Sequence, residues 1–253
     1  MNIKLMIATH KNYKLPKDGI YYPVHVGSYG KESIGYQRDD QGENISIKNP
    51  NYCELTGLYW AWKNLDCDYF GLVHYRRHFV GSKAKDKWDR VISSKQLVGL
   101  LRKTDIIMPK KRNYFIETTY DQYVHAHHAK DLDITRDIIK EKYPSYLSEF
   151  DSCMISTKGH KFNMFIMKKQ YADQYCEWLF DILFELERRL DISSYSSYDA
   201  RVFGFVSERL IDVWLNTNHL TYQELPVVFM EKQNWFNKGI NFLKRKFLNK
   251  DRC

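Results

Sequence analysis

The sequence predicts a single α/β domain with a mostly parallel central sheet flanked by helices. Short apolar runs of strand length alternate with longer segments of helical periodicity, which is the pattern of a helix-covered parallel sheet. A chain of 253 residues can bury a core without disulfides or a structural metal. Its 43% hydrophobic and 28% charged residues are ordinary for a soluble globular protein. No apolar run approaches the roughly 18–20 residues of a membrane span, and we expect no secretory leader.

The first elements alternate strand and loop. Ile3–Ala8 is an apolar run that predicts a first strand with a polar end, and Tyr22–Val26 predicts a second one. Residues 27–50 are polar and contain several glycines, which predicts a long loop. A loop of this length inside a compact domain is usually functional.

A helix is predicted next, with Asn51 as its N-cap and Glu54 as the reciprocal partner three residues on. Its apolar face recurs at spacings of three and four residues. The residues of that face are Leu55, Leu58, Trp62 and Leu65.

The remaining elements complete the alternation. Tyr69–Val73 is wholly apolar and predicts a central strand buried on both faces. Asp105–Met108 and Phe162–Met167 predict further strands, and the second leads into a helix with one aromatic and aliphatic face. A last helix is expected over about 199–215. In such sheets ligands bind at the carboxyl ends of the strands.

The stretch His74–His78 follows the most convincing buried strand. Its two adjacent arginines and two histidines concentrate positive charge at the edge where ligands bind. Since the planar guanidinium donates two parallel hydrogen bonds, Arg is the preferred partner for phosphate. The alternative is a solvated turn whose charges face water.

Asp66-Cys67-Asp68 has the spelling of a metal-binding Asp-x-Asp motif. It precedes the central strand instead of following it, so it would lie at the wrong edge of the sheet. We therefore expect a helix-to-strand turn there.

Several other polar residues leave alternatives open. Asn163 is either a strand-end cap or a ligand contact, Asp199 a helix cap or a site residue, and Glu208 a solvated partner of Arg209 or a base. A second cluster joins aromatic rings to acids and histidines, as sugar-binding surfaces do, although such rings are also ordinary core residues. It contains Tyr120, Asp121, Tyr123, His125, His127 and His128. No accompanying ligand pattern supports zinc.

The five cysteines are scattered singly, which is typical of reduced thiols in a cytosolic protein. Of the net charge of +8, a surplus of five lies in the last sixteen residues. Trp235, Ile240, Leu243 and Phe247 recur at roughly helical spacing among these cations, so residues 231–253 are predicted to be a basic amphipathic tail that contacts a membrane surface. A terminal helix packed on the domain is the alternative. Dinucleotide, P-loop, hydrolase and kinase motifs are absent from the sequence.

Several motifs together resemble one bacterial family. They are the runs Tyr22-Pro-Val-His-Val-Gly, Asn44-Ile-Ser-Ile-Lys-Asn-Pro-Asn-Tyr-Cys-Glu-Leu-Thr, Tyr59-Trp-Ala-Trp-Lys-Asn, Gly71-Leu-Val-His-Tyr-Arg-Arg and Asn163-Met-Phe-Ile-Met. That family is described as galactofuranosyltransferases of capsule, exopolysaccharide and O-antigen synthesis, and was formerly a domain of unknown function. The resemblance covers about residues 2–230.

The resemblance implies a GT-A-like glycosyltransferase domain over residues 1–230 and an inverting transfer from UDP-galactofuranose. With it, we expect His74, Arg76 and Arg77 to neutralise the departing diphosphate, so no cofactor is expected, although Mn²⁺ or Mg²⁺ is not excluded. The other expected donor contacts are Thr9, His10, Asp39, Asp40, Asn44 and Asn163. The candidate bases are Asp199, Glu208 and Asp121.

The expected partners are a UDP-sugar and a lipid-linked glycan, met at the inner face of the cell membrane by a cytoplasmic, peripheral protein. A non-catalytic nucleotide-sugar or glycan-binding module is the alternative. Nucleic acid is not an expected partner, because no reader motif is present and the surplus charge lies in the tail.

Overall fold

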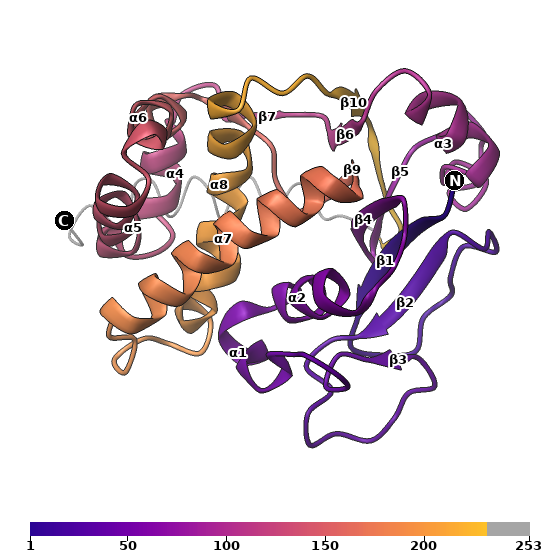
Figure 1. Ribbon diagram of the computed structural model, residues 1–253, viewed down its shortest axis with the longest axis horizontal. Helices are drawn as coiled ribbons and strands as arrows, with labels where there is room; N and C mark the ends of the chain where they lie inside the picture. Colours follow the sequence, from indigo (N-terminus) through magenta and orange to yellow (C-terminus); the bar gives the residue numbers. More distant parts are fainter. Residues whose placement is uncertain (232–253) are drawn as a thin grey trace.

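The computed structural model describes residues 1–231, and they form the predicted α/β architecture (Figure 1). The strands are β1 Ile3–Thr9, β2 Tyr21–His25, β3 Gln37–Arg38, β4 Tyr69–His74, β5 Arg77–Phe79, β6 Ile106–Pro109, β7 Arg112–Asn113, β8 Lys158–Gly159, β9 Phe165–Lys168, β10 Gln223–Leu225 and β11 Val227–Phe229. The α-helices are α1 Asn49–Tyr52, α2 Leu55–Asn64, α3 Ser94–Leu101, α4 Thr119–Val124, α5 Ala129–Lys142, α6 Leu147–Ile155, α7 Lys169–Arg189 and α8 Val202–Thr217. Short 3₁₀ turns are η1 Ser46–Lys48, η2 Pro144–Tyr146 and η3 Asp199–Arg201.

The central sheet has the strand order β10-β6-β9-β4-β1-β2-β3, with β5 and β11 paired beside β4. The adjacent strands β4, β1, β2 and β3 run parallel to one another, and β10 runs parallel to β6. Strand β9 is antiparallel to both of its neighbours, β4 and β6. The predicted mostly parallel sheet is therefore confirmed. Because β9 is reversed, its first residues lie at the same edge as the last residues of β1, β2 and β4.

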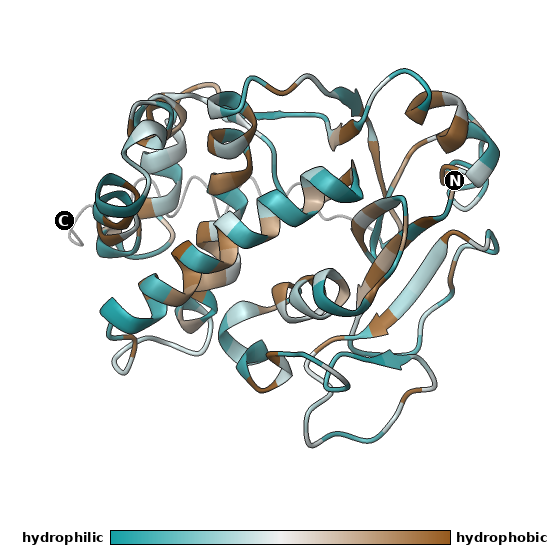
Figure 2. Ribbon diagram, viewed as in Figure 1, coloured by the Kyte–Doolittle hydropathy of each residue, from teal (hydrophilic) through white to brown (hydrophobic). Residues whose placement is uncertain are grey.

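Alternating residues of the central strands enter two separate cores. Phe70 and Leu72 of β4 face the core covered by α2 and α7, whereas Tyr69 and Val73 face the core completed by α3. This two-faced burial is the one predicted for the central strand. Helix α7 shows hydrophilic residues along its outer side in Figure 2, as a helix with one buried face should.

The helix predicted to begin at Asn51 is interrupted. Cys53 has a positive φ of 54°, so α1 ends before it and α2 begins at Leu55. The predicted cap is wrong, because Asn51 lies inside α1 and its amide donates to the Ala200 carbonyl at 2.7 Å. Glu54 stands at the N-cap of α2 without a side-chain capping bond, so its carboxylate is available elsewhere.

The strand predicted from Phe162 begins later, at Phe165. Phe162 and Asn163 have positive φ angles of 79° and 53°, so they form a turn at the edge of the sheet. The predicted tail lies outside the described residues, apart from Glu231. Within residues 1–231 we find no helix with the length and apolarity needed to cross a bilayer.

Candidate active site

A cavity of about 580 Å³ opens at the edge of the sheet where β1 and β4 end. We call it the edge cavity. The loop after β2, helix α1 and the turn before α8 complete its walls. Its lining residues are Ala8, His10, Val26, Lys31, Asn49, Pro50, Cys53, Glu54, His74, Tyr75, Arg76 and Arg201.

Positive charge dominates this lining. Among the described residues that line the cavity, three are cations, Lys31, Arg76 and Arg201, and one is a carboxylate, Glu54. The pKa of His10 is lowered by burial and then by the charges of Lys11, Arg76 and Lys31, which reports a positive potential in the cavity. Such a lining suits a ligand with several negative charges. At the rim, Arg76 also pairs with Glu231 at 3.4 Å.

Glu54 is the carboxylate of the edge cavity. Its Oε1 accepts a hydrogen bond from the amide of Asn163 at 2.8 Å. Burial raises the pKa of Glu54, and the bond from Asn163 with the charges of Arg201 and Arg77 opposes that rise only in part. A carboxylate with a raised pKa that faces a cavity is suited to accept a proton near neutral pH.

The turn before β9 fixes the position of Glu54. Asn163 is 7% exposed, and its amide also donates to the Gly204 carbonyl and accepts from Ser207. Next to it, the Phe162 carbonyl accepts from His74 Nε2 at 2.6 Å. Asn163, predicted as a donor contact, thus lies behind Glu54 and orients it.

The structure places His74, Arg76 and Arg77 in three different environments. Burial, aided by the charge of Arg77, lowers the pKa of His74 to about 4, so this side chain is neutral at pH 7 and not the predicted cation. Arg77 is absent from the lining and packs over the Phe162 ring at 4.4 Å. Of the three, Arg76 is the charged group that lines the edge cavity.

The predicted contacts from the long loop have structural roles. Asp39 is 0% exposed, and its carboxylate accepts five hydrogen bonds from residues of three segments. Asp40 pairs with Arg38, and Asn44 accepts from the Ser46 backbone N–H. Neither these residues nor the buried Thr9 line the edge cavity, whereas His10 does.

The three predicted bases also lie outside this lining. Asp121 accepts a hydrogen bond from Thr118 at the start of α4, Asp199 faces a different cavity, and Glu208 accepts from the Phe162 N–H at 3.2 Å. The capping pattern predicts a structural role for Glu54, so the sequence does not identify it as a site residue. The available signal was its place in the Cys53–Thr56 run that carries the family resemblance.

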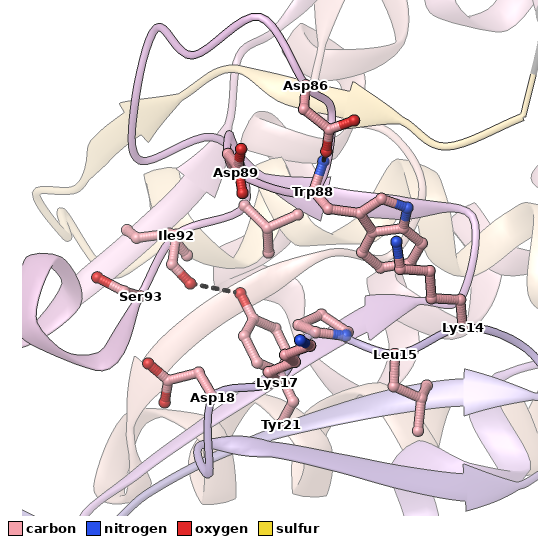
Figure 3. A pocket seen from close by; sticks show the side chains of 12 residues that line it. Lys14, Leu15, Lys17, Asp18, Tyr21, Asp86, Trp88, Asp89, Ile92 and Ser93 are labelled. Carbon is pink, nitrogen blue, oxygen red and sulfur yellow. Dashed lines mark hydrogen bonds between the residues drawn. The ribbon is translucent and has the colours of Figure 1, made fainter.

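A further cavity of about 310 Å³ lies on the flank of the sheet, between the loops 14–18 and 86–93 (Figure 3). Three of its polar side chains, Lys14, Asp18 and Tyr21, already have partners. The Tyr21 hydroxyl donates to the Ile92 carbonyl at 2.7 Å, Lys14 lies over Trp88, and Asp18 accepts from the Ser94 N–H at the start of α3. These contacts stabilise the fold, and we assign no chemistry to them.

The residues 1–231 contain no group of three or more His, Cys, Asp or Glu side chains placed to hold a metal ion. Asp66 and Asp68 lie in the turn between α2 and β4, as predicted, and Asp68 accepts from the Asn2 N–H at 2.6 Å. That turn is at the edge of the sheet opposite the edge cavity.

Comparisons with known proteins agree with this architecture. A family model described as "Domain of unknown function (DUF4422)" matches residues 4–219. A solved structure described as "WbbM bifunctional glycosytransferase apo structure" matches with a TM-score of 0.85 and 30% sequence identity over 92% of this chain. The match spans 46% of that longer chain, which is less than half of its length. No curated protein matches the sequence.

Proposed function

This chain belongs to the family described as domain of unknown function DUF4422, and we propose that it is a glycosyltransferase that uses a nucleotide-sugar donor. The similar solved structure is that of a bifunctional glycosyltransferase, which supports this class. The observation that carries the proposal is the edge cavity, whose described lining combines three cations with one carboxylate of raised pKa.

We further propose that the donor is UDP-galactofuranose, on the resemblance carried by the Cys-Glu-Leu-Thr and His-Tyr-Arg-Arg motifs. Arg76 and Lys31 bind the diphosphate through charge-assisted hydrogen bonds. The proton affinity of His74, which is neutral in the resting site, rises when two negative phosphates approach it. The cavity thereby offsets the charge that develops on the leaving group.

The reaction proposed is a single in-line displacement with inversion. The oxygen of an acceptor hydroxyl bonds to the anomeric carbon, and the bond from that carbon to the phosphate oxygen breaks. UDP leaves with the bonding electron pair. The hydroxyl proton passes to Glu54, which the amide of Asn163 holds in place.

The acceptor in this proposal is a lipid-linked glycan at the inner face of the cell membrane. It follows from the family resemblance and from the basic composition of residues 231–253. The alternative is a binding module without turnover, and the experiment below distinguishes the two.

The test is incubation of the purified protein with UDP-galactofuranose and a synthetic galactoside, with and without EDTA. We expect a product one hexose heavier that persists in EDTA, because cationic side chains replace a metal at the diphosphate. Loss of product in EDTA would contradict the metal-free mechanism but retain the enzyme. Donor binding without product or hydrolysis would favour the binding module.

Arg76→Ala supplies a second check on the same mechanism. Removing this cation should raise the KM for the donor at least tenfold, since a hydrogen bond to a charged group contributes about 1.5–3 kcal/mol. An unchanged KM for the donor in Arg76→Ala would make the diphosphate assignment wrong.

A further inference from the structure

A second cavity lies beside the edge cavity, between the end of α4, the start of α5 and η3. We call it the histidine cavity. It encloses about 450 Å³. Its lining residues are Tyr120, Val124, Ala126, His127, His128, Ala129, Lys130 and Asp199.

Arg201 connects the two cavities. Its Nε donates to the Cys53 thiol at 3.1 Å on the side of the edge cavity. Its guanidinium lies 5.4 Å from the centre of the Phe205 ring, and that ring stacks on His127 at 4.2 Å. One guanidinium and one aromatic ring therefore lie between the two spaces.

The histidine cavity offers the flat ring of His128 beside hydrogen-bonding groups. The His127 side chain is only 6% exposed. His128 stacks on Tyr195 with ring centres 4.1 Å apart, and its side chain is still 42% exposed. His127 stacks on Tyr198 in the same way at 5.6 Å. The Asp199 carboxylate lies 3.3 Å from His127 and can accept hydrogen bonds from hydroxyl groups.

The charges of the two cavities differ. In the histidine cavity Asp199 and Lys130 balance each other, whereas three cations face one carboxylate in the edge cavity. Burial acts to raise the pKa of Asp199, but hydrogen bonds from Ser196 and His127 and the nearby imidazoles outweigh it and lower that pKa. Asp199 therefore stays ionised and acts as a hydrogen-bond acceptor. A neutral ligand rich in hydroxyl groups fits this balance, and a phosphate does not.

We propose that the histidine cavity is an acceptor subsite that binds one sugar ring of a neutral glycan chain. The proposal rests on the transferase function proposed above. Because Glu54 lies in the edge cavity, beyond Arg201, the bound ring is not the one whose hydroxyl reacts. The subsite instead holds a ring further along the acceptor, and so selects acceptors by length.

The test uses the full chain, UDP-galactofuranose, and a galactose-containing monosaccharide and trisaccharide as acceptors. His128→Ala removes the exposed ring, and Ala126→Trp fills the cavity from a half-buried position. His125→Ala is the matched control, since this residue lies in the same turn but pairs with Glu117 outside the cavity. Thermal unfolding of each variant checks that it folds.

We expect both cavity variants to raise the KM for the trisaccharide about tenfold or more. The KM for the donor, the rate of donor hydrolysis and transfer to the monosaccharide should stay as in the parent protein. Equal losses with both acceptors, a change in donor KM, or the same effect from His125→Ala would overturn the proposal.

A direct binding measurement separates this proposal from the proposed function. The trisaccharide alone should shift the imidazole proton signals of His127 and His128 in the NMR spectrum, with His128→Ala identifying its own signal. If those shifts appear while the parent protein neither transfers nor hydrolyses the donor, the transferase function fails and the sugar site stands. If the trisaccharide leaves both signals unchanged while transfer proceeds, the subsite is wrong and the function stands.

Discussion

Glu54 has three properties that the proposed chemistry requires of one side chain. It faces the cationic cavity, burial raises its pKa, and the amide of Asn163 holds one of its oxygens at 2.8 Å. Each property comes from a different part of the chain: the break at Cys53, the packing around α2, and the turn before β9. The role of this residue therefore depends on the tertiary structure.

We expect Glu54→Gln to lower kcat by about 10²–10⁴-fold, which is the usual contribution of a general base. Gln keeps the size of the side chain, so the KM for the donor and the thermal stability should change little. In the parent protein, kcat should rise with pH as Glu54 loses its proton, above the ordinary carboxyl pKa because that pKa is raised.

Glu208→Gln is the control for this prediction, because Glu208 is one of the bases predicted from the sequence and contacts the same turn, accepting from the Phe162 N–H. We expect a smaller loss of activity from it than from Glu54→Gln. A larger loss at Glu208, with activity retained by Glu54→Gln, would move the base to α8.

His78 is a source of acid sensitivity. It is 0% exposed, and burial lowers its pKa to about 4. Within residues 1–231, neither ring nitrogen has a hydrogen bond of good geometry. The unfolded chain takes up a proton near pH 6.5 and the folded chain does not, so stability falls as the pH drops from about 6.5 to 4.

For His78 alone, the free energy of unfolding should fall by about 2 kcal/mol between pH 7 and pH 5, at about 1.4 kcal/mol for each pH unit below 6.5. His78→Phe should remove that part of the pH dependence, measured by urea unfolding at both pH values. Replacing the exposed His219 with Asn is the control and should leave the slope unchanged. An unaltered slope in His78→Phe would show that this residue titrates normally.

At the scale of elements, Asp39 joins the loop after β2 to η1 and α2. Its carboxylate accepts from the Gly27 and Ser28 backbone N–H groups and from three hydroxyls, those of Ser28, Ser46 and Thr56. Gly27 has a positive φ of 61°, and a Cβ there would lie 2.2 Å from the Asn49 side chain in the wall of the edge cavity. The loop therefore shapes the cavity although Asp39 does not touch it.

We expect Asp39→Ala to lower the free energy of unfolding by more than about 3 kcal/mol. Each buried donor left without a partner costs about 1–3 kcal/mol, and several are left at once. Asp39→Asn keeps part of the network and should cost less. Chemical unfolding measures both variants. A small effect of Asp39→Ala would mean that the loop rearranges or that water takes the place of the carboxylate.

In the whole molecule, the two hydrophobic cores around the sheet lie within residues 1–231. Most of the excess of basic over acidic residues lies in residues 232–253. The membrane contact that we propose for this chain rests on the basic composition of those last residues. Charge substitutions among them test that proposal directly.

Replacing Lys244, Arg245 and Lys246 with Gln should weaken binding to anionic vesicles about 100-fold, since each basic residue contributes about 1 kcal/mol near such a surface. Transfer to a water-soluble acceptor and thermal stability should not change. The control replaces the exposed Lys95, Lys103 and Lys140, which removes the same charge elsewhere. Vesicle sedimentation provides the measurement, and equal weakening by both triple variants would show that only net charge matters.

The α/β class, the central strand and the helices α7 and α8 follow from the amino-acid sequence alone. Their apolar periodicity depends on which residues are hydrophobic, and that can be read without coordinates. The sequence also indicates the edge of the sheet where the charged residues lie, because ligands bind at the carboxyl ends of parallel strands in this fold class.

Which polar side chains lie together depends on how the chain folds. A positive φ at Cys53 released Glu54 from its predicted cap, burial and Arg77 left His74 neutral, and five hydrogen bonds placed Asp39 in a loop interior. Backbone torsions, desolvation and contacts between distant segments leave no periodic pattern in the sequence. For that physical reason the edge cavity was predictable as a location, and its carboxylate was not.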